Sequence, residues 1–227
     1  MELDSYSEST TSFFTLDACN GEIAEKIFTT LSKIGKELES DWKKLVNINQ
    51  DLESRLRSQG IDEPSKRSSI PWDDAMILFT CSVEINNQNR PIPLGEALSK
   101  ERFGRFPWGD GSAIGYLIDY LRPNNGNKNN ADDYEVLISL INKLNSYCIE
   151  TPIGGEKYRN GMGGLCIRGF IDKSEVFQLR KFLTSRIWSV SADEPIDGGV
   201  RDAIKHLVAI LKSAERRGVG AMLRAHS

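Results

Sequence analysis

The sequence predicts an α+β protein that is mainly helical, with a small antiparallel or mixed sheet. Two observations predict this class. Apolar residues recur every three or four positions through several long segments, as they do on the buried face of a helix. A few short segments instead alternate apolar and polar residues or follow a turn signal, as strands do. With 227 residues, 39% of them hydrophobic, the chain can bury a core without disulfides or a metal.

The first predicted element is a long N-terminal amphipathic helix over residues 20–58, closed by Gly60. At about 1.5 Å per residue it would exceed about 50 Å, so part of its apolar stripe would overhang a small domain. A break near residues 46–49, where Val, Asn and Ile weaken helix propensity, gives the alternative of a helical hairpin. The stripe consists of Ile27, Leu31, Ile34, Leu38, Trp42, Leu45, Ile48, Leu52 and Leu56.

Two domain arrangements are compatible with this pattern. Residues 1–60 form an N-terminal helical segment beside an α+β domain of residues 61–227, or the chain is one continuous domain. Residues 1–63 carry 7 Lys and Arg against 13 Asp and Glu, a net charge of −6, whereas residues 168–227 carry 11 against 7, a net charge of +4. We therefore expect the two ends to pack on one another, to face a charged partner, or to carry solvated helix faces.

The middle of the chain is predicted to contain one strand and three helices. Residues 76–85 form the strand, because its alternate residues from Ile77 to Ile85 are all apolar and the others grade to polar. Periodic apolar residues predict the helices, and Asp110 or Ser112 can cap the second one. The predicted helices cover residues 94–102, 113–121 and 132–147.

The last quarter has clear signals for helix ends. A capping box in its Asp variant at residues 172–175 opens a helix that is predicted to continue through Trp188. The next helix opens at Asp197 and stops at Gly218, after a basic run that suits a helix C-terminus. Residues 219–224 are short and apolar enough to form a terminal strand.

The glycine-rich stretch at residues 156–170 is predicted to be a β-hairpin. A phosphate-binding loop places its glycines directly before a helix, but these precede LCIRGF, which reads as a strand. Asn160-Gly161 is a strong two-residue turn signal, because a type I′ turn needs positive φ at both positions. Ligand- or partner-binding candidates border this hairpin, and the alternative is that they are isolated surface side chains. The candidates are Trp108, Tyr158, Arg159 and Arg168.

No set of catalytic or metal-binding residues can be assigned. The chain has two histidines, and Cys19, Cys81, Cys148 and Cys166 show no spacing typical of a metal site. We therefore expect no metal and no cofactor, catalytic residues stay unknown, and a non-enzymatic role is favoured. The cysteines are expected to be buried free thiols in the cytoplasm.

Two segments resemble the YfbM-like family of uncharacterised bacterial proteins. One is PWGDGSAIGYLIDYL at residues 107–121, and the other is the order from IRGFIDKSEVFQLRKFL to AERRGVGAML. The resemblance covers residues 105–225 and rests on patterns of apolar residues. It implies an α+β fold and supplies no activity, so no catalytic residue can be carried over.

A cytoplasmic protein-binding module is the function that these observations favour, with an immunity or antitoxin-like protein that neutralises a toxic partner as the specific form. One alternative is a small-ligand-binding protein or hydrolase with a cleft near residues 156–170. Another is a structural protein that self-assembles through the long N-terminal helix. A sequence pI of about 5.6 argues against a nucleic-acid partner, and the short apolar runs argue against a membrane.

Overall fold

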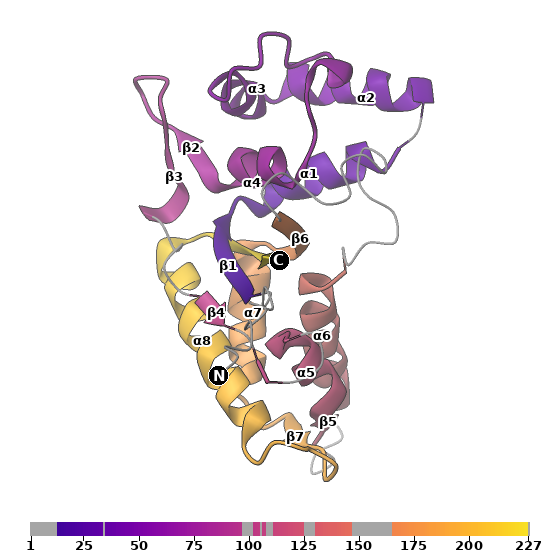
Figure 1. Cartoon of the computed structure of the whole chain (residues 1–227), viewed down its shortest axis with the longest axis vertical. Coiled ribbons are helices and arrows are strands. Elements are labelled where there is room, and N and C mark those ends of the chain that lie inside the picture. The colour runs from indigo at the N-terminus through magenta and orange to yellow at the C-terminus, as the bar shows by residue number, and fades with distance from the viewer. Residues whose placement is uncertain are drawn as a thin grey trace, which may run out of the picture.

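A four-stranded antiparallel sheet joins strands from both ends of the chain, in the order β4-β1-β8-β6. Helices α1 to α4 gather at one end of the molecule, whereas α5 to α8 form the other end (Figure 1). The α+β class and the small antiparallel sheet are thereby confirmed. This computed structural model describes residues 13–33, 35–96, 102–104, 106–107, 111–124, 130–146 and 165–226.

The elements follow one another along the chain in two groups. The first comprises β1 (Phe13–Cys19), α1 (Gly21–Leu31), α2 (Gly35–Ile48), α3 (Gln50–Arg57), η1 (Arg67–Ser69), α4 (Asp74–Ser82), β2 (Val83–Ile85), β3 (Pro91–Pro93), η2 (Leu94–Glu96) and β4 (Arg102–Gly104). The second comprises α5 (Ala113–Tyr120), β5 (Leu121–Pro123), α6 (Asn130–Leu144), β6 (Leu165–Ile171), α7 (Lys173–Leu183), β7 (Trp188–Val190), α8 (Gly199–Arg217) and β8 (Gly220–His226).

The central sheet separates two hydrophobic cores. Side chains alternate between the faces of a strand, and directly opposite residues of an antiparallel pair share a face. Leu16 of β1 and Leu223 of β8 face α5 to α8, whereas Asp17 and Met222, the next pair, face α1 to α4. We call these the α5–α8 core, which includes Phe14, Leu16, Leu207, Leu211 and Leu223, and the α1–α4 core, which includes Cys19, Trp42, Cys81, Phe170 and Met222.

Local signals correctly predicted the start of α7, the end of α8 and the terminal strand. Asp172 accepts hydrogen bonds from the backbone of Ser174 and Glu175, and Glu175 accepts one from the Asp172 N–H, so the capping box is confirmed. Helix α8 stops at Gly218, whose φ of 67° is the left-handed conformation that glycine favours. The predicted strand at the C-terminus is β8.

Helix α7 ends earlier than the sequence suggested. It stops at Leu183, with Thr184 as its C-cap, and the predicted continuation through Trp188 is wrong. Trp188 instead begins β7, opposite Pro123 of β5, and its indole Nε1 donates to the Leu183 carbonyl at 3.1 Å. Strand pairing with β5 takes the place of another helical turn.

The single N-terminal helix is wrong, because residues 20–58 form α1, α2 and α3. The predicted break falls at Asn49, whose side chain accepts from the Leu52 N–H and caps α3. A second break follows Leu31, and α2 starts at Gly35 with φ at 68°. These turns let Trp42 pack edge-on against Trp72, with ring centroids 5.0 Å apart, instead of overhanging the domain.

Residues 76–85 are mostly helical, so the predicted strand there is wrong except for β2. Asp73 caps α4 by accepting from the Met76 N–H at 2.8 Å. The alternation of apolar residues suggested a strand, but in α4 residues of both alternating sets are buried. These are Leu78 and Thr80 from one set and Ile77 and Cys81 from the other. Helix α4 packs against α1, β1 and β6.

The remaining predictions have mixed outcomes. Helices α5 and α6 confirm the two helices predicted at residues 113–121 and 132–147, and Ser112 is the cap of α5. Of the helix predicted at residues 94–102, the structure describes η2 at residues 94–96 and places Arg102 in β4, so the predicted helical end at Arg102 is wrong; the residues between lie outside the described part of the chain. Strand β1 was not predicted. Strand β6 confirms the strand after the glycines, whereas the turn at Asn160-Gly161 lies outside the described residues.

Among the described helices, none combines the length and the apolar character needed to cross a membrane.

Candidate functional site

The predicted cleft near the glycine-rich hairpin lies mostly outside the described residues. Trp108, Tyr158 and Arg159 belong to segments that the structure does not describe. Arg168 sits in β6, where the register shifts between Ile167 and Gly169, and its guanidinium carbon is 5.9 Å from the centroid of the Phe14 ring. The proposed grouping of the four candidates therefore stays a prediction.

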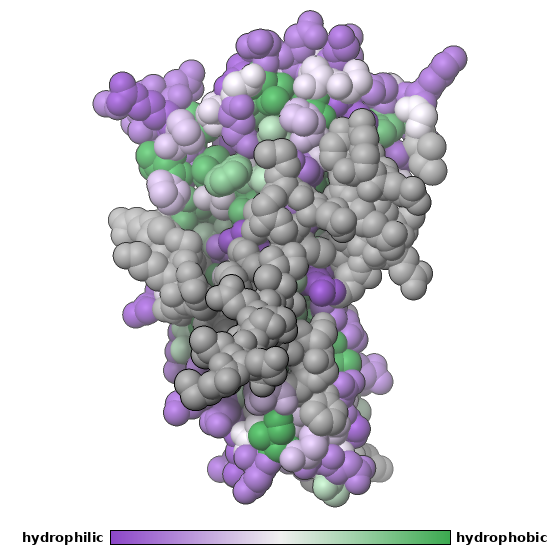
Figure 2. All heavy atoms as spheres, in the orientation of Figure 1, coloured by the Kyte–Doolittle hydropathy of each residue, from purple (hydrophilic) through white to green (hydrophobic). Residues whose placement is uncertain are grey.

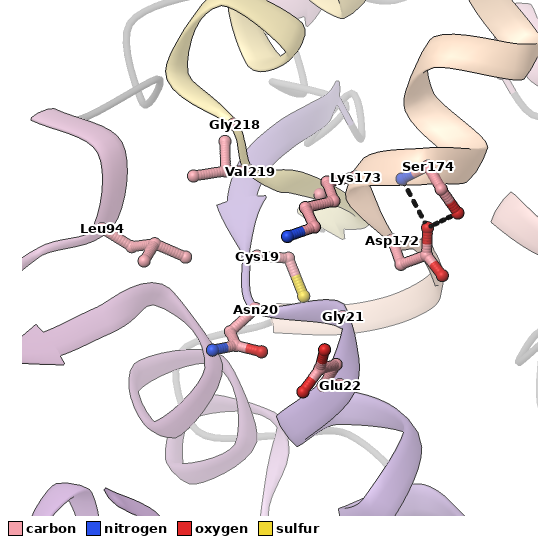
Figure 3. A pocket seen from close by; sticks show the side chains of 11 residues that line it. Cys19, Asn20, Gly21, Glu22, Leu94, Asp172, Lys173, Ser174, Gly218 and Val219 are labelled. Atoms are coloured by element: carbon pink, nitrogen blue, oxygen red, sulfur yellow. Dashed lines mark hydrogen bonds between the residues drawn. The ribbon is translucent and has the colours of Figure 1, made fainter.

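A hollow of about 350 Å³ lies where the N-termini of α1 and α7 meet the start of β8 (Figure 3). Small residues make this meeting possible. A Cβ on Gly21 would lie 2.6 Å from the Asp172 Cα, and one on Gly220 would lie 2.3 Å from the Ile171 carbonyl oxygen. The hollow is lined by Cys19, Asn20, Gly21, Glu22, Leu94, Asp172, Lys173, Ser174, Gly218, Val219 and Gly220.

The paired helix N-termini do not make this hollow an anion site. Each helix already has an acceptor at its N-terminus, because Asn20 accepts from the Ile23 N–H and Asp172 accepts from the Glu175 N–H. Burial raises the pKa of Asp172, but the hydrogen bonds from Glu175 and Ser174 outweigh it and lower that pKa overall. The Asp172 carboxylate thus occupies the place that a phosphate oxygen would take.

The sheet face toward α1 to α4 carries a buried ion pair. Arg224 Nε donates to Asp17 Oδ2 at 2.6 Å, and the Thr15 hydroxyl donates to the same oxygen at 3.0 Å. All three side chains are buried, so the carboxylate and the guanidinium compensate one another's loss of water. This layer joins two strands that are far apart in the sequence.

Asp74, the half-buried first residue of α4, lies beside this polar layer. Its Oδ2 accepts from the Ile167 N–H of β6 at 3.0 Å, which ties α4 to the edge of the sheet. Burial raises the pKa of Asp74 to about 6; the Ile167 N–H and Arg224 oppose the rise, and neighbouring Asp73 adds to it. Asp74 therefore titrates closer to neutrality than an ordinary carboxyl group.

A buried arginine holds α3, α4 and β2 together. Arg55 Nη1 donates to the carbonyl oxygens of Thr80 and Val83, and its Nε donates to Asp51 at 2.9 Å. The guanidinium therefore donates to backbone carbonyl oxygens at the junction of α4 and β2. Without Arg55, these oxygens would be buried without hydrogen-bond partners.

An exposed apolar surface lies over α4 and the β2–β3 hairpin (Figure 2). Phe79 is 54% exposed and Ile92 is 37% exposed. Ile92 lies opposite Glu84, so it is on the other face of the hairpin from the half-buried Val83 and Ile85. We call Phe79 and Ile92 the hairpin surface. Larger exposed apolar patches on folded proteins commonly mark contact sites for other molecules.

The outer edge of this hairpin is unsuited to strand pairing. Pro91 and Pro93 lie opposite Ile85 and Val83 in β3, and a proline has no N–H to donate to a further strand. Arg55 donates to the Val83 carbonyl oxygen on the β2 side of the hairpin. A partner would therefore contact the side chains of the hairpin rather than extend its ladder.

No group of three or more His, Cys, Asp or Glu within the described ranges could hold a metal ion. The chain matches no protein-family model, no curated protein and no solved structure.

Sequence reasoning missed the buried polar layer, although one signal for it was present. The segment FFTLDAC alternates apolar and polar residues, and a charged residue inside such a strand indicates a buried partner. The identity of that partner, Arg224, had no comparable signal because the two residues lie at opposite ends of the chain.

Proposed function

We propose that the chain is a protein-binding module and that the hairpin surface is where its partner docks. The exposure of Phe79 and Ile92 on adjoining elements is the observation that carries the proposal. Burying such side chains against a partner is favourable by about 25 cal/mol per Å² of apolar area, before the costs of association. A partner helix or sheet face that packs against the side chains fits the proline-bearing edge of β3 better than an added strand does.

We place this module in the cytoplasm. The thiols of Cys19 and Cys81 are free and buried, which suits a reducing compartment. An immunity or antitoxin-like role, in which the partner is a toxic protein held inactive, is the specific form of the proposal. The resemblance to the YfbM-like family adds a bacterial origin as an expectation and brings no activity.

The test compares two variants of the full chain in affinity capture from the native lysate. Phe79→Ser with Ile92→Ser removes the apolar contacts of the hairpin surface. Ile48→Ser is the matched control, because Ile48 is 84% exposed and lies outside that surface, where α2 ends. Loss of two central apolar contacts is expected to weaken binding by at least about tenfold.

Retention of the partner by the Phe79/Ile92 variant, with loss in the Ile48 variant, would place docking elsewhere and reject the hairpin surface. Capture of the bait alone, with a mass in solution above one chain, would instead support self-assembly through residues 20–58. Thermal stabilisation of the chain by a small molecule, without any captured protein, would favour the ligand-binding alternative.

A further inference from the structure

Two cysteines meet in the α1–α4 core at the junction between the sheet and α4. Cys19 ends β1 and Cys81 lies in the last turn of α4, and each is 0% exposed. The backbone N–H of Asn20, the next residue, donates to the Cys81 carbonyl oxygen at 2.8 Å. This bond brings the backbones of the two cysteines into direct contact.

This hydrogen bond sets an upper limit to the distance between the Cα atoms of Cys19 and Cys81. Standard bond lengths place the Asn20 nitrogen about 2.4 Å from the Cys19 Cα and the Cys81 oxygen about 2.4 Å from its own Cα. With the hydrogen bond between them, the two Cα atoms are at most about 7.6 Å apart, and less wherever the path bends. Disulfide-bonded cysteines have Cα atoms about 4.4 to 6.8 Å apart, so the upper limit lies only slightly above that range.

The thiols themselves also lie close together. The Cys81 thiol is within hydrogen-bonding reach of Cys19 and raises the pKa of the Cys19 thiol, and burial raises it further. Cys19 also lines the hollow between α1 and α7, where its side chain stands among the lining residues (Figure 3). A small oxidant can therefore approach the pair from that hollow once the structure opens locally.

We propose that Cys19 and Cys81 form a reversible dithiol–disulfide pair, oxidised by a peroxide, that locks α4 to the end of β1. One thiol loses its proton, and its sulfur attacks hydrogen peroxide. The O–O bond breaks, and the products are a sulfenic acid and water. The second thiol then attacks the sulfenic sulfur, which forms the S–S bond and releases a second water.

The neighbouring thiol determines the course of this chemistry. A sulfenic acid at one cysteine meets the other thiol at once, so it condenses to a disulfide before a second peroxide can oxidise it further. The raised pKa of Cys19 keeps the closed pair slow to react, because the thiolate is the nucleophile. Disulfide formation is therefore expected to accelerate as pH rises.

The pair goes beyond the proposed function and does not depend on it. Helix α4 runs directly into β2, so a bond at Cys81 restrains the element that carries Phe79 and leads into the hairpin surface. If the hairpin surface binds no partner, the bond still forms and still restrains α4. Failure of one proposal therefore leaves the other intact.

The test uses the full chain treated with hydrogen peroxide, then quenched in acid, alkylated and digested without reduction. We expect a cross-linked peptide pair containing Cys19 and Cys81, and we expect dithiothreitol to reverse it. The melting temperature should rise on oxidation in the wild type and stay unchanged in Cys19→Ser, which keeps every other cysteine. Hydrogen exchange in α4 should slow on oxidation in the wild type only.

Two results would overturn the proposal. One is recovery of both Cys19 and Cys81 in alkylated form after peroxide has oxidised other residues of the same sample. The other is cross-linking of Cys19 or Cys81 to Cys148 or Cys166 instead of to each other. Cys81→Ser is the second variant, so that poor folding of Cys19→Ser leaves the thermal comparison intact.

Discussion

The two sides of the central sheet differ in what they bury. On the α5–α8 side, the buried polar residues that the structure describes are Ser112 and Ser213. On the α1–α4 side lie the buried charged residues and the two cysteine thiols that the structure describes: Asp17, Arg55, Arg224, Cys19 and Cys81. Apolar contacts respond little to pH or oxidants, whereas carboxylates and thiols do. We therefore expect changes in stability with pH or oxidants to arise mainly on the α1–α4 side.

The outer surfaces do not repeat this contrast, because Val136 of α6 is 40% exposed and Phe177 of α7 is 47% exposed. The α1–α4 side carries Phe79 and Ile92, the exposed residues of the hairpin surface. Both proposals therefore concern the same end of the molecule in Figure 1, one through its exterior and one through its core. Three substitutions would test whether the two sides differ as this comparison requires, and they follow in order of expected effect.

Removal of the charge on Asp17 should have the largest effect. Asp17→Asn leaves the Arg224 guanidinium buried without a carboxylate, and breaking such a pair costs about 3 to 5 kcal/mol. Urea unfolding measures the loss of unfolding free energy. The double variant Asp17→Asn with Arg224→Gln should recover part of it, because no unpaired charge remains. A loss below about 1 kcal/mol for Asp17→Asn would show that the ion pair is effectively solvated, as surface pairs are.

A cavity in the α5–α8 core should lower the free energy of unfolding slightly less than Asp17→Asn does. Its effect should also be independent of pH. Leu211 of α8 is fully buried, and Leu→Ala in such a site costs about 2 to 5 kcal/mol. We expect about 3 kcal/mol for Leu211→Ala, equal at pH 4 and pH 7 because no titratable group changes. The control is Ala209→Gly, which replaces an exposed residue of the same helix at a cost of about 1 kcal/mol. A strong pH dependence for Leu211→Ala would contradict the comparison.

The smallest expected effect is the change in stability that follows from ionisation of Asp74. Its pKa is raised from 3.8 to about 6 in the folded chain, so the native state binds the proton more tightly than the unfolded state. Stability from this group is therefore present below about pH 4 and is lost as pH rises through 6. Asp74→Asn keeps an oxygen for the Ile167 N–H and never ionises.

Asp74→Asn should therefore be more stable than the wild type at pH 7, by about 1 kcal/mol after allowance for solvent screening of the partly exposed carboxyl. The two proteins should be equally stable near pH 3.5. Urea unfolding at both pH values gives the comparison, and Asp73→Asn, at the adjacent capping carboxylate, serves as the control. A wild type and variant that differ equally at both pH values would mean that Asp74 does not titrate in this window.

Only part of the candidate site could be predicted from the sequence. Free, buried thiols at Cys19 and Cys81 were predicted from their spacing, and the structure confirms both. Their contact could not be predicted, because it depends on α4 being a helix that ends beside β1. The hairpin surface was missed for the same reason, since Phe79 was assigned to the inner face of a strand.

On the α5–α8 side, local chemistry in the sequence was sufficient for the start of α7 and for the end of α8. The capping box at Asp172, the stop at Gly218 and the stripe of α8 each involve residues within one or two helical turns, so the interactions that decide them are close in sequence. Strand β8 was also recognised, although its partners were not.

Tertiary contacts decided the α1–α4 side. Strand β1 exists because it lies between β4 and β8, and the Asp17–Arg224 bond crosses 207 positions of sequence. Residues 20–58 have the period of one straight helix. The chain instead forms three shorter helices, in which Trp42, Leu52 and Leu56 are fully buried. Residues 76–85 were predicted to be a strand from their alternation, but residues 74–82 form a helix that packs against α1, β1 and β6. Apolar periodicity shows which residues will be buried, but the shape of the space that buries them is set by distant parts of the chain.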